Sequence, residues 1–322
     1  MRYRRLGRTG IEVSEIGYGA WGIGGAQWGG ADDDDSIAAL NHAIDLGLNF
    51  IDTALAYGEG RSERLVGEVV RRRPEIIHVA TKVPPKNGTW PAPDDARVED
   101  VFPADHVLRC ARRSLANLGL ETITLLQLHV WNDAWADQGD WRDAVGELRS
   151  TGAIRFFGVS INDHEPANSL RLIESGAADT VQVIYNVFDQ SPEDELFHAC
   201  REHDIGVIAR VPLDEGGLTG TVQPDSRFAE DDHRSDYFRG DRPREVHERV
   251  ARIVSDLGIA ETEVAETALR YVLSEPTVST VIPGMRSKRN VERNVAASDG
   301  QGLDERRREK LHAHRWLRNF YR

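Results

Sequence analysis

The chain has 322 residues, of which 40% are apolar and 29% charged, so it can bury a large core and is neither a disordered nor a fibrous protein. Its 40 basic residues face 53 acidic ones, and the resulting formal net charge of -13 argues against binding to nucleic acid or to an anionic membrane. No apolar run approaches the roughly 20 residues that cross a bilayer, and residues 1–7 are basic and polar, so we expect a cytoplasmic protein.

Short β-rich runs alternate with helical patterns roughly every 25 to 30 residues, which is typical of repeated βα units. The runs predict eight strands, at residues 16–20, 49–53, 76–83, 124–129, 154–160, 181–186, 207–211 and 278–283. Helical patterns with acidic or Ser/Asp starts lie at residues 34–46, 62–72, 104–118, 140–150, 166–174 and 194–202. Eight strands that each need a crossover helix can close into a (β/α)8 TIM barrel, an α/β fold. We expect residues 1–322 to form one such domain.

Three further segments lie outside the predicted βα units or interrupt them. Residues 3–14 carry a turn signal at residues 8–10, so they predict an N-terminal β-hairpin that closes the bottom of the barrel. Residues 213–242 are long, acidic and poorly periodic, which indicates either a functional lid or mobile loop, or a solvated excursion. Residues 304–322 begin as a charged C-terminal helix and end in an apolar stretch, residues 316–321, that we expect to fold back onto the body or onto a neighbouring subunit.

The glycines of residues 17–22 match GxGxxG after a predicted strand, which would be a dinucleotide fingerprint if a helix opened at once. The chain instead continues through further glycines, and the next helical pattern begins only after the acidic run 32–35. We therefore favour a glycine-rich loop that carries Trp21 and Trp28 at the mouth of a barrel. The aspartates of that run are typical of a helix N-terminus, with metal binding a distant alternative.

In a barrel of this kind the active site lies at the carboxyl ends of the strands. The polar residues at the predicted ends are, in chain order, Asp52, Tyr57, Lys82, His129, Ser160, Gln182, Asn186, Arg210 and residues 284–286. Most of them have a plain structural alternative, such as a loop cap, packing at the rim or a satisfied core histidine. Lys82 is harder to explain in this way, because it ends an apolar run and a buried ammonium group costs several kcal/mol unless a partner compensates it. Asp52, at the end of the adjacent strand, is the natural partner.

These groups suit proton transfer. A tyrosine with an ordinary pKa near 10 is a poor acid or base at pH 7, and we expect the neighbouring Lys82 cation to lower the pKa of Tyr57. His129 would hydrogen-bond a substrate carbonyl and fix its orientation. We find no metal-ligand set, no Ser/His/Asp order and no Walker loop, and Cys110 and Cys200 predict neither a disulfide nor a zinc site. The pattern favours reduction of a carbonyl with a borrowed hydride.

The sequence resembles the aldo-keto reductase superfamily over essentially its whole length. The matching motifs, in order, are residues 3–10 (YRRLGRTG), 49–58 (NFIDTALAYG), 62–63 (SE), 80–82 (ATK), 128–129 (LH), 158–160 (GVS) and 281–284 (VIPG). The resemblance implies the same barrel and a nicotinamide cofactor as hydride donor. It also implies a catalytic tetrad of Asp52, Tyr57, Lys82 and His129, in which Tyr57 is the general acid.

The resemblance further implies which residues hold NADPH/NADP+. They are Trp21, Asp52, Ser160, Gln182, Arg210, Leu213, Gly217, Gly284, Arg286, Arg293 and Asn294. Ser160 and Gln182 would bind the nicotinamide carboxamide, although Ile161 stands where the family often has Asn and leaves Asn162 as the candidate substitute. Arg210 replaces a stacking aromatic ring, and a guanidinium plane can stack too. Arg293 replaces a common glutamate.

A second set of expectations concerns the phosphate and the substrate. Four basic residues, Arg286, Lys288, Arg289 and Arg293, follow the last predicted strand and favour NADPH through its 2′-phosphate, with a solvated basic helix face as the alternative. The substrate is a small-molecule aldehyde or ketone, or in reverse the alcohol, and the residues expected to contact it are Trp28, Tyr57, His129 and Trp131. Two other functions stay open: a Schiff-base lyase that uses Lys82, and a non-catalytic nucleotide-sensing subunit similar to potassium-channel β subunits. A homo-oligomer is possible.

Overall fold

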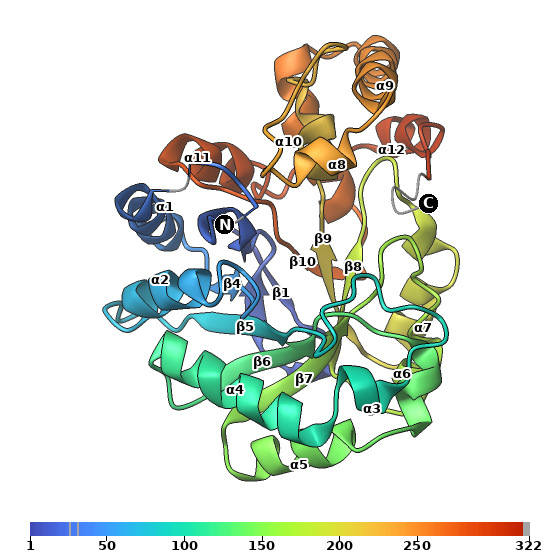
Figure 1. Cartoon of the computed structure of the whole chain (residues 1–322). Helices are drawn as coiled ribbons and strands as arrows, with labels where there is room; N and C mark the ends of the chain where they lie inside the picture. The colour runs from blue at the N-terminus through green and yellow to red at the C-terminus, as the bar shows by residue number, and fades with distance from the viewer. Residues whose placement is uncertain (26, 31, 318–322) are drawn as a thin grey trace.

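The computed structural model describes residues 1–25, 27–30 and 32–317, and its centre is an eight-stranded parallel sheet (Figure 1). The strands are β3 (Tyr18–Gly19), β4 (Phe50–Asp52), β5 (His78–Val83), β6 (Ile123–Leu128), β7 (Ile154–Ser160), β8 (Thr180–Ile184), β9 (Gly206–Arg210) and β10 (Val278–Val281). They follow one another around the sheet in chain order. Parallel bridges from Ile16 to Val281 and from Gly19 to Gly284 join the first strand to the last, so the sheet closes into the predicted barrel.

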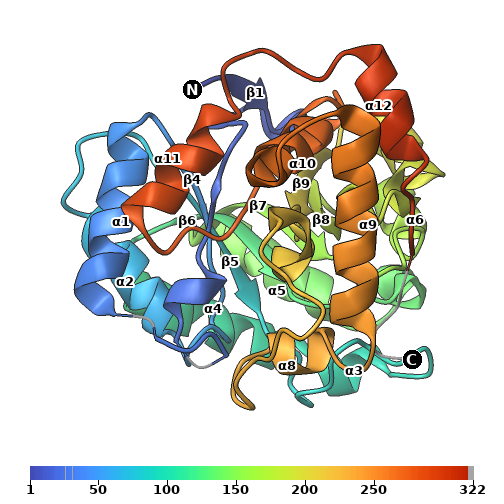
Figure 2. The same ribbon diagram turned by 90° about the horizontal axis from the view of Figure 1, so that it is seen from above.

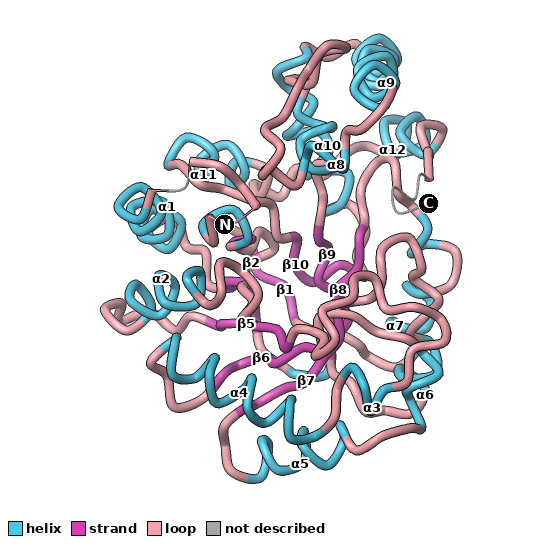
Figure 3. Tube along the Cα trace, viewed as in Figure 1, coloured by secondary structure: helices cyan, strands magenta, loops and turns pink. Residues whose placement is uncertain are grey.

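The helices surround the strands, as Figure 3 shows in cyan and magenta. They are α1 (Asp33–Asp45), α2 (Arg61–Val70), α3 (Val98–Val101), α4 (Ala104–Leu118), α5 (Trp141–Ser150), α6 (Leu170–Glu174), α7 (Leu196–Glu202), α8 (Arg234–Tyr237), α9 (Arg242–Leu257), α10 (Val264–Leu273), α11 (Lys288–Ala296) and α12 (Glu305–His312). Strands such as β5, β6 and β8 are buried along their whole length, because one face meets the barrel interior and the other meets the helices. None of the described helices is both long and apolar enough to span a membrane.

The N-terminal hairpin closes one end of the barrel. Strands β1 (Tyr3–Arg5) and β2 (Glu12–Ser14) pair antiparallel, as predicted. Leu6, Ile11 and Val13 are buried in a core cluster with residues of the barrel strands, among them Phe50 and Ile208. Figure 2 shows β1 at one end of the barrel and α3 and α8 at the opposite end. The hairpin therefore leaves the other end of the barrel as the place for a site.

The C-terminal segment does fold back onto the body. After α12 the backbone N–H of Trp316 donates to the carbonyl oxygen of Phe188 over 2.8 Å, and the two rings meet edge to face. The guanidinium of Arg249 lies 4.0 Å from the centroid of the Trp316 ring, a cation–π contact. The rest of the predicted apolar stretch, residues 318–321, lies outside the described residues.

Candidate active site

A cavity of about 1520 Å³ lies at the carboxyl ends of the strands. Most residues predicted for the site line it: Trp21, Trp28, Asp52, Tyr57, His129, Ser160, Gln182, Arg210, Leu213, Gly284, Arg286, Arg293 and Asn294. They come from the ends of seven different strands or from the loops that follow them. The parallel barrel thus gathers at one mouth residues that are far apart in the sequence.

Three predicted residues lie elsewhere. Lys82 is fully buried beneath the cavity, where it contacts the residues that line it. Gly217 is buried behind the wall, and its neighbour Gly216 lines the cavity instead. Trp131, contrary to the expectation from the sequence, does not reach the cavity.

The position of Trp131 follows from its packing. Its ring is fully buried between the rings of Trp135 and Trp141, with centroids 5.8 Å and 5.4 Å away in edge-to-face geometry. Trp141 lies on α5, so Trp131 belongs to the layer between the strands and the helices. The tryptophan that lines the cavity at this side is Trp90, from the loop after β5, which the sequence pattern did not single out.

The Lys82 ammonium group is held by three acceptors. It donates hydrogen bonds to the carboxylate of Asp52 and, over 2.8 Å, to the carbonyl oxygen of Thr53. Its third bond, 3.3 Å long, reaches the hydroxyl of Tyr57. Strands β4 and β5 are parallel neighbours with Asp52 opposite Ala80, and Lys82 follows two residues later on the same face of β5. The register of these two strands therefore brings the carboxylate and the ammonium together.

The second carboxylate oxygen of Asp52 is also occupied. It accepts from the side-chain amide nitrogen of Gln182 over 2.8 Å and from that of Gln127 over 3.2 Å. Gln127 lies on β6 and is fully buried, and the only signal for it in the sequence was a polar residue within an apolar strand. The buried charge pair is thus surrounded by groups that satisfy it, which a buried ion pair needs if it is to be tolerated.

The electrostatics keep Lys82 charged. Burial acts to lower the pKa of Lys82, but the charge of Asp52 and the contact with Tyr57 outweigh it, so that the pKa is raised above its ordinary value. A lysine in this state is a cation at neutral pH. It acts as a hydrogen-bond donor and as a positive charge, not as a free amine.

Tyr57 lies in the turn between β4 and α2, with its ring against the Lys82 ammonium, which is 5.0 Å from the ring centroid. Ser62 on α2 fixes this turn, because its backbone N–H donates to the Tyr57 carbonyl over 3.3 Å and its hydroxyl donates to the Ala20 carbonyl over 2.9 Å. Burial raises the pKa of Tyr57 above 10, and Lys82 only partly opposes this. The expectation of a lowered pKa is therefore reversed, and the hydroxyl carries its proton at neutral pH.

His129, directly after β6, is neutral. Burial and the nearby cations Lys82 and Arg210 hold the pKa of His129 well below its ordinary value of 6.5. Its ring meets the Tyr57 ring edge to face at 5.6 Å. Within the part of the chain that the structure describes, the Nδ1 atom is buried without a hydrogen-bond partner. A neutral imidazole offers one N–H donor, which suits a carbonyl oxygen better than a charged group.

The opposite side of the cavity is lined by α11, whose residues Arg289, Arg293 and Asn294 face it. Ser287 caps this helix, because its hydroxyl accepts from the backbone N–H of Asn290 over 3.3 Å. Arg286 also lines the cavity, whereas Lys288 does not. Backbone N–H groups and cations at a helix start are suited to a phosphate group.

Two residues proposed from the sequence as cofactor contacts have other partners as well. Arg210 donates to the carbonyl oxygen of Ile161 over 2.9 Å and forms an ion pair with Asp163, which holds its guanidinium at the cavity wall. Asn162 uses its side-chain amide on the main chain of Ala92, so it is not a free substitute for the asparagine of the family pattern.

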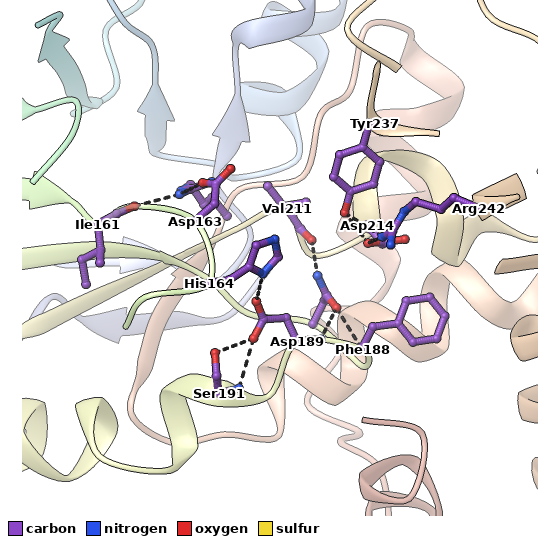
Figure 4. A network of polar contacts seen from close by, with 12 residues as sticks. Ile161, Asp163, His164, Phe188, Asp189, Ser191, Val211, Asp214, Tyr237 and Arg242 are labelled. Carbon is purple, nitrogen blue, oxygen red and sulfur yellow. Dashed lines mark hydrogen bonds and ion pairs between the residues drawn. The ribbon is translucent and has the colours of Figure 1, made fainter. Parts of the chain in front are cut away.

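The two ends of the segment 213–242, residues 213–221 and 233–239, contribute to the wall of the cavity, whereas most of residues 223–231 are exposed to solvent. The buried carboxylate of Asp214 accepts from the hydroxyl of Tyr237 and, over 2.9 Å, from Arg242 (Figure 4). Asp214 and its neighbour Glu215 have positive φ values, 50° and 52°, a conformation that costs non-glycine residues on the order of 1–3 kcal/mol each. The buried contacts of Asp214 offset that strain and hold the segment in place.

This segment also meets the loop after β3 across the cavity. The backbone N–H of His233 donates to the carbonyl oxygen of Gln27 over 2.9 Å, and the guanidinium of Arg234 lies 4.9 Å from the ring centroid of Trp28. Arg286 joins the same loop through the Gly29 carbonyl, 2.8 Å away. Loops from three strand ends therefore enclose the site.

The sequence is similar to known proteins over most of its length. Residues 15–314 match the model of the Aldo/keto reductase family. The chain is 31% identical over 303 residues to the aldo-keto reductase YhdN of Bacillus subtilis, which covers 91% of this chain and 87% of that protein.

Two solved structures have the same fold over nearly the whole chain. The glycerol dehydrogenase of Gluconobacter oxydans superimposes with a TM-score of 0.77 at 28% identity, covering 97% of this chain and 94% of that one. An aldo/keto reductase of Klebsiella pneumoniae, solved in complex with NADP and acetate, gives a TM-score of 0.70 at 26% identity and covers 98% and 96%.

The buried pair makes a prediction about stability. Lys82→Met leaves the Asp52 carboxylate buried without its cation, so the free energy of unfolding should fall by about 3–5 kcal/mol. The double variant Lys82→Met/Asp52→Asn removes the unpaired charge and should recover part of that loss, as measured by urea denaturation. Lys86→Met, at an exposed lysine four residues away, is the control and should change stability by less than about 0.5 kcal/mol. A double variant no more stable than Lys82→Met would show that the two groups are not coupled.

Proposed function

The chain belongs to the aldo/keto reductase family, and on that premise we propose that it is an NADPH-dependent reductase that converts an aldehyde or ketone into the alcohol. One observation carries the proposal: a buried, fully paired Lys82 contacts the hydroxyl of a protonated Tyr57 at the wall of a large cavity. A volume of about 1520 Å³ exceeds the roughly 300–1,000 Å³ of pockets for drug-sized ligands, and it suits a dinucleotide together with a small substrate.

The chemistry divides between cofactor and protein. A bound NADPH supplies the hydride that reduces the carbonyl carbon. Tyr57 gives its hydroxyl proton to the carbonyl oxygen as negative charge develops there. Lys82 stabilises the tyrosinate that remains, through its hydrogen bond and its charge, while Asp52 keeps Lys82 in position. In the reverse direction the tyrosinate accepts the proton of the alcohol.

His129 orients the substrate in this scheme. As a neutral imidazole beside Tyr57 it would donate a hydrogen bond from its one ring N–H to the carbonyl oxygen, so that the oxygen lies within reach of both groups. Trp21 also stacks on the Tyr57 ring, with centroids 6.0 Å apart and planes at 23°. The ring of the proton donor thus contacts two other rings, those of Trp21 and His129.

The cofactor assignment rests on the residues that line the rest of the cavity. Ser160 and Gln182, which are paired on the neighbouring strands β7 and β8, would hold the carboxamide, and Arg210 would offer a flat guanidinium to the nicotinamide. Leu213 and the main chain at Gly216 would contact the pyrophosphate, and the residues after β10 would hold the adenosine end. The complex of the Klebsiella pneumoniae relative with NADP supports this reading.

The same observations weigh against a Schiff-base lyase. Such a reaction needs a lysine that loses its charge, and here Asp52 and Tyr57 raise the pKa of Lys82 despite its burial. Trapping of a carbonyl substrate on Lys82 with borohydride would overturn this argument.

Tyr57→Phe should bind NADPH with nearly unchanged affinity but reduce carbonyl substrates roughly 100- to 10,000-fold more slowly, because the change removes the proton donor and little else. Fluorescence titration with NADPH and steady-state turnover on a panel of aldehydes and ketones measure the two effects. Equal turnover by the variant would remove Tyr57 from the role of acid. Binding of NADPH by the unmodified protein without turnover of any carbonyl would favour the nucleotide-sensing alternative.

The raised pKa of Tyr57 predicts opposite pH dependences for the two directions. Reduction uses the protonated hydroxyl, so its kcat should stay level up to about pH 9 and fall only as the pH passes the raised pKa, above about 10. Oxidation of the alcohol uses the tyrosinate and should accelerate over the same range. A reduction rate that declined between pH 6 and 8 would contradict the protonation state assigned to Tyr57.

The basic residues after β10 predict preference for NADPH over NADH. Arg286 lies nearest the strand end and lines the cavity, so Arg286→Ala should weaken NADPH binding by about tenfold or more and leave NADH binding less affected. Lys288→Ala is the matched control, because Lys288 lies two residues away and does not line the cavity. Equal affinities of the unmodified protein for the two cofactors in parallel fluorescence titrations would rule out the NADPH assignment.

A further inference from the structure

We propose that Trp90 selects substrates in which the carbonyl is carried on a flat ring, and that Asn162 is the positioning residue that holds Trp90 over His129. The proposal rests on the proposed function and adds the substrate class of the same site. It starts from a side chain that has no assigned task in the reductase scheme, the buried amide of Asn162.

Asn162 makes a two-point contact with a single residue. Its side-chain oxygen accepts from the backbone N–H of Ala92 over 3.3 Å, and its amide nitrogen donates to the carbonyl oxygen of Ala92 over 3.1 Å. Both residues are 5% exposed. Only an amide of this length offers a donor and an acceptor in one plane to the two main-chain groups of Ala92. Because the contact is buried, removing it leaves polar groups unsatisfied.

The contact spans the mouth of the barrel. Asn162 follows β7, whereas Ala92 lies in the loop after β5, and β6 runs between these two strands. His129 follows β6, so the bridge from Asn162 to Ala92 joins the loops on either side of the strand that carries His129. Asn132 and Trp135 hold the loop further along, at residues 93–96, so Asn162 is the anchor next to Trp90.

Trp90 sits against the substrate-orienting histidine. Its ring centroid is 4.4 Å from that of His129, with the planes at 90°, and 40% of Trp90 stays exposed. Trp21, Tyr57, His129 and Trp90 thus form a continuous row of rings, with the proton donor in the middle. A flat ring whose carbonyl reaches the Tyr57 hydroxyl would pack against this row, and aromatic contacts of this kind add to the gain from burial alone.

The charges at this end favour an uncharged substrate. The two cations that act on Tyr57, Lys82 and Arg210, each pair with a carboxylate, Asp52 and Asp163 respectively. A substrate carboxylate would have to compete with these pairs. Selection by ring stacking is therefore the interaction that the described residues support here.

The first experiment compares benzaldehyde with propanal, both reduced with NADPH. The unmodified protein should have a kcat/KM for benzaldehyde at least about tenfold higher than for propanal. Trp90→Ala should lose most of that ratio, because the loss falls mainly on benzaldehyde, whereas Trp90→Phe keeps a flat ring and should retain most of it. An unmodified protein that reduces both aldehydes without preference would overturn the inference and leave the reductase assignment standing. Reduction of no carbonyl at all would refute the assignment, and the inference with it.

The second experiment tests whether Asn162 acts through Trp90. Asn162→Ala should lower the benzaldehyde-to-propanal ratio, and Asn162→Ala/Trp90→Ala should lower it no further than Trp90→Ala alone. The Kd of the Asn162→Ala variant for NADPH should stay within about twofold of the value for the unmodified protein. A large rise in that Kd, with the ratio unchanged, would instead make Asn162 a cofactor ligand and overturn its positioning role.

A variant that fails to fold would not end the test. Asn162→Asp keeps an acceptor for the Ala92 N–H but replaces the amide donor with a carboxylate oxygen that repels the Ala92 carbonyl oxygen. Circular dichroism together with thermal unfolding establishes whether each variant is native. Asn162→Asp should show an intermediate ratio. If the folded Asn162→Asp and Trp90→Ala variants both kept the full benzaldehyde preference, the proposal would be wrong.

Discussion

Burial of one ammonium group, that of Lys82, is the constraint on which the rest of the site depends. An unpaired cation in a barrel interior would cost several kcal/mol, so each of its donors needs an acceptor. Asp52, the Thr53 carbonyl and the Tyr57 hydroxyl supply them, and Gln127 and Gln182 satisfy the remaining oxygen of Asp52. The chemistry of Tyr57 is therefore tied to the stability of the barrel itself.

The barrel makes this arrangement possible because the residues that close its core and the residues that form the site lie at opposite ends. The hairpin residues Leu6, Ile11 and Val13 fill the end where the strands begin, and the loops at the other end are free to vary. Those loops are not independent of one another. His233 meets the loop after β3, and Asn162 meets the loop after β5, so contacts between loops set the shape of the cavity that the strands only outline.

The predictable part of the molecule is the part governed by periodicity and by strand ends. All eight strands, the hairpin and the polar residues Asp52, Tyr57 and His129 could be placed from the sequence, because a barrel strand has a fixed direction and a fixed end. The position of Trp90 and the contact of Asn162 with Ala92 could not, since loop geometry has no period and that contact joins residues 70 positions apart. The raised pKa of Tyr57 could not be predicted for the same reason: the charge of Lys82 is visible in the sequence, but the burial of Tyr57 is not.

The two sides of the cavity suit different parts of a ligand, and this difference fixes the orientation in which a ligand can bind. Around Tyr57 the cations are paired and the walls are aromatic, so shape and stacking decide the fit. At α11 the wall carries Arg289 in the first turn after the Ser287 cap and Arg293 in the last turn, so negative charge is favoured there. A ligand with a phosphate at one end and a flat ring at the other would fit only one way round, with its ring toward Tyr57. A nicotinamide dinucleotide has that polarity, and under the proposed function the carbonyl substrate would approach from the side where Trp90 and His129 meet.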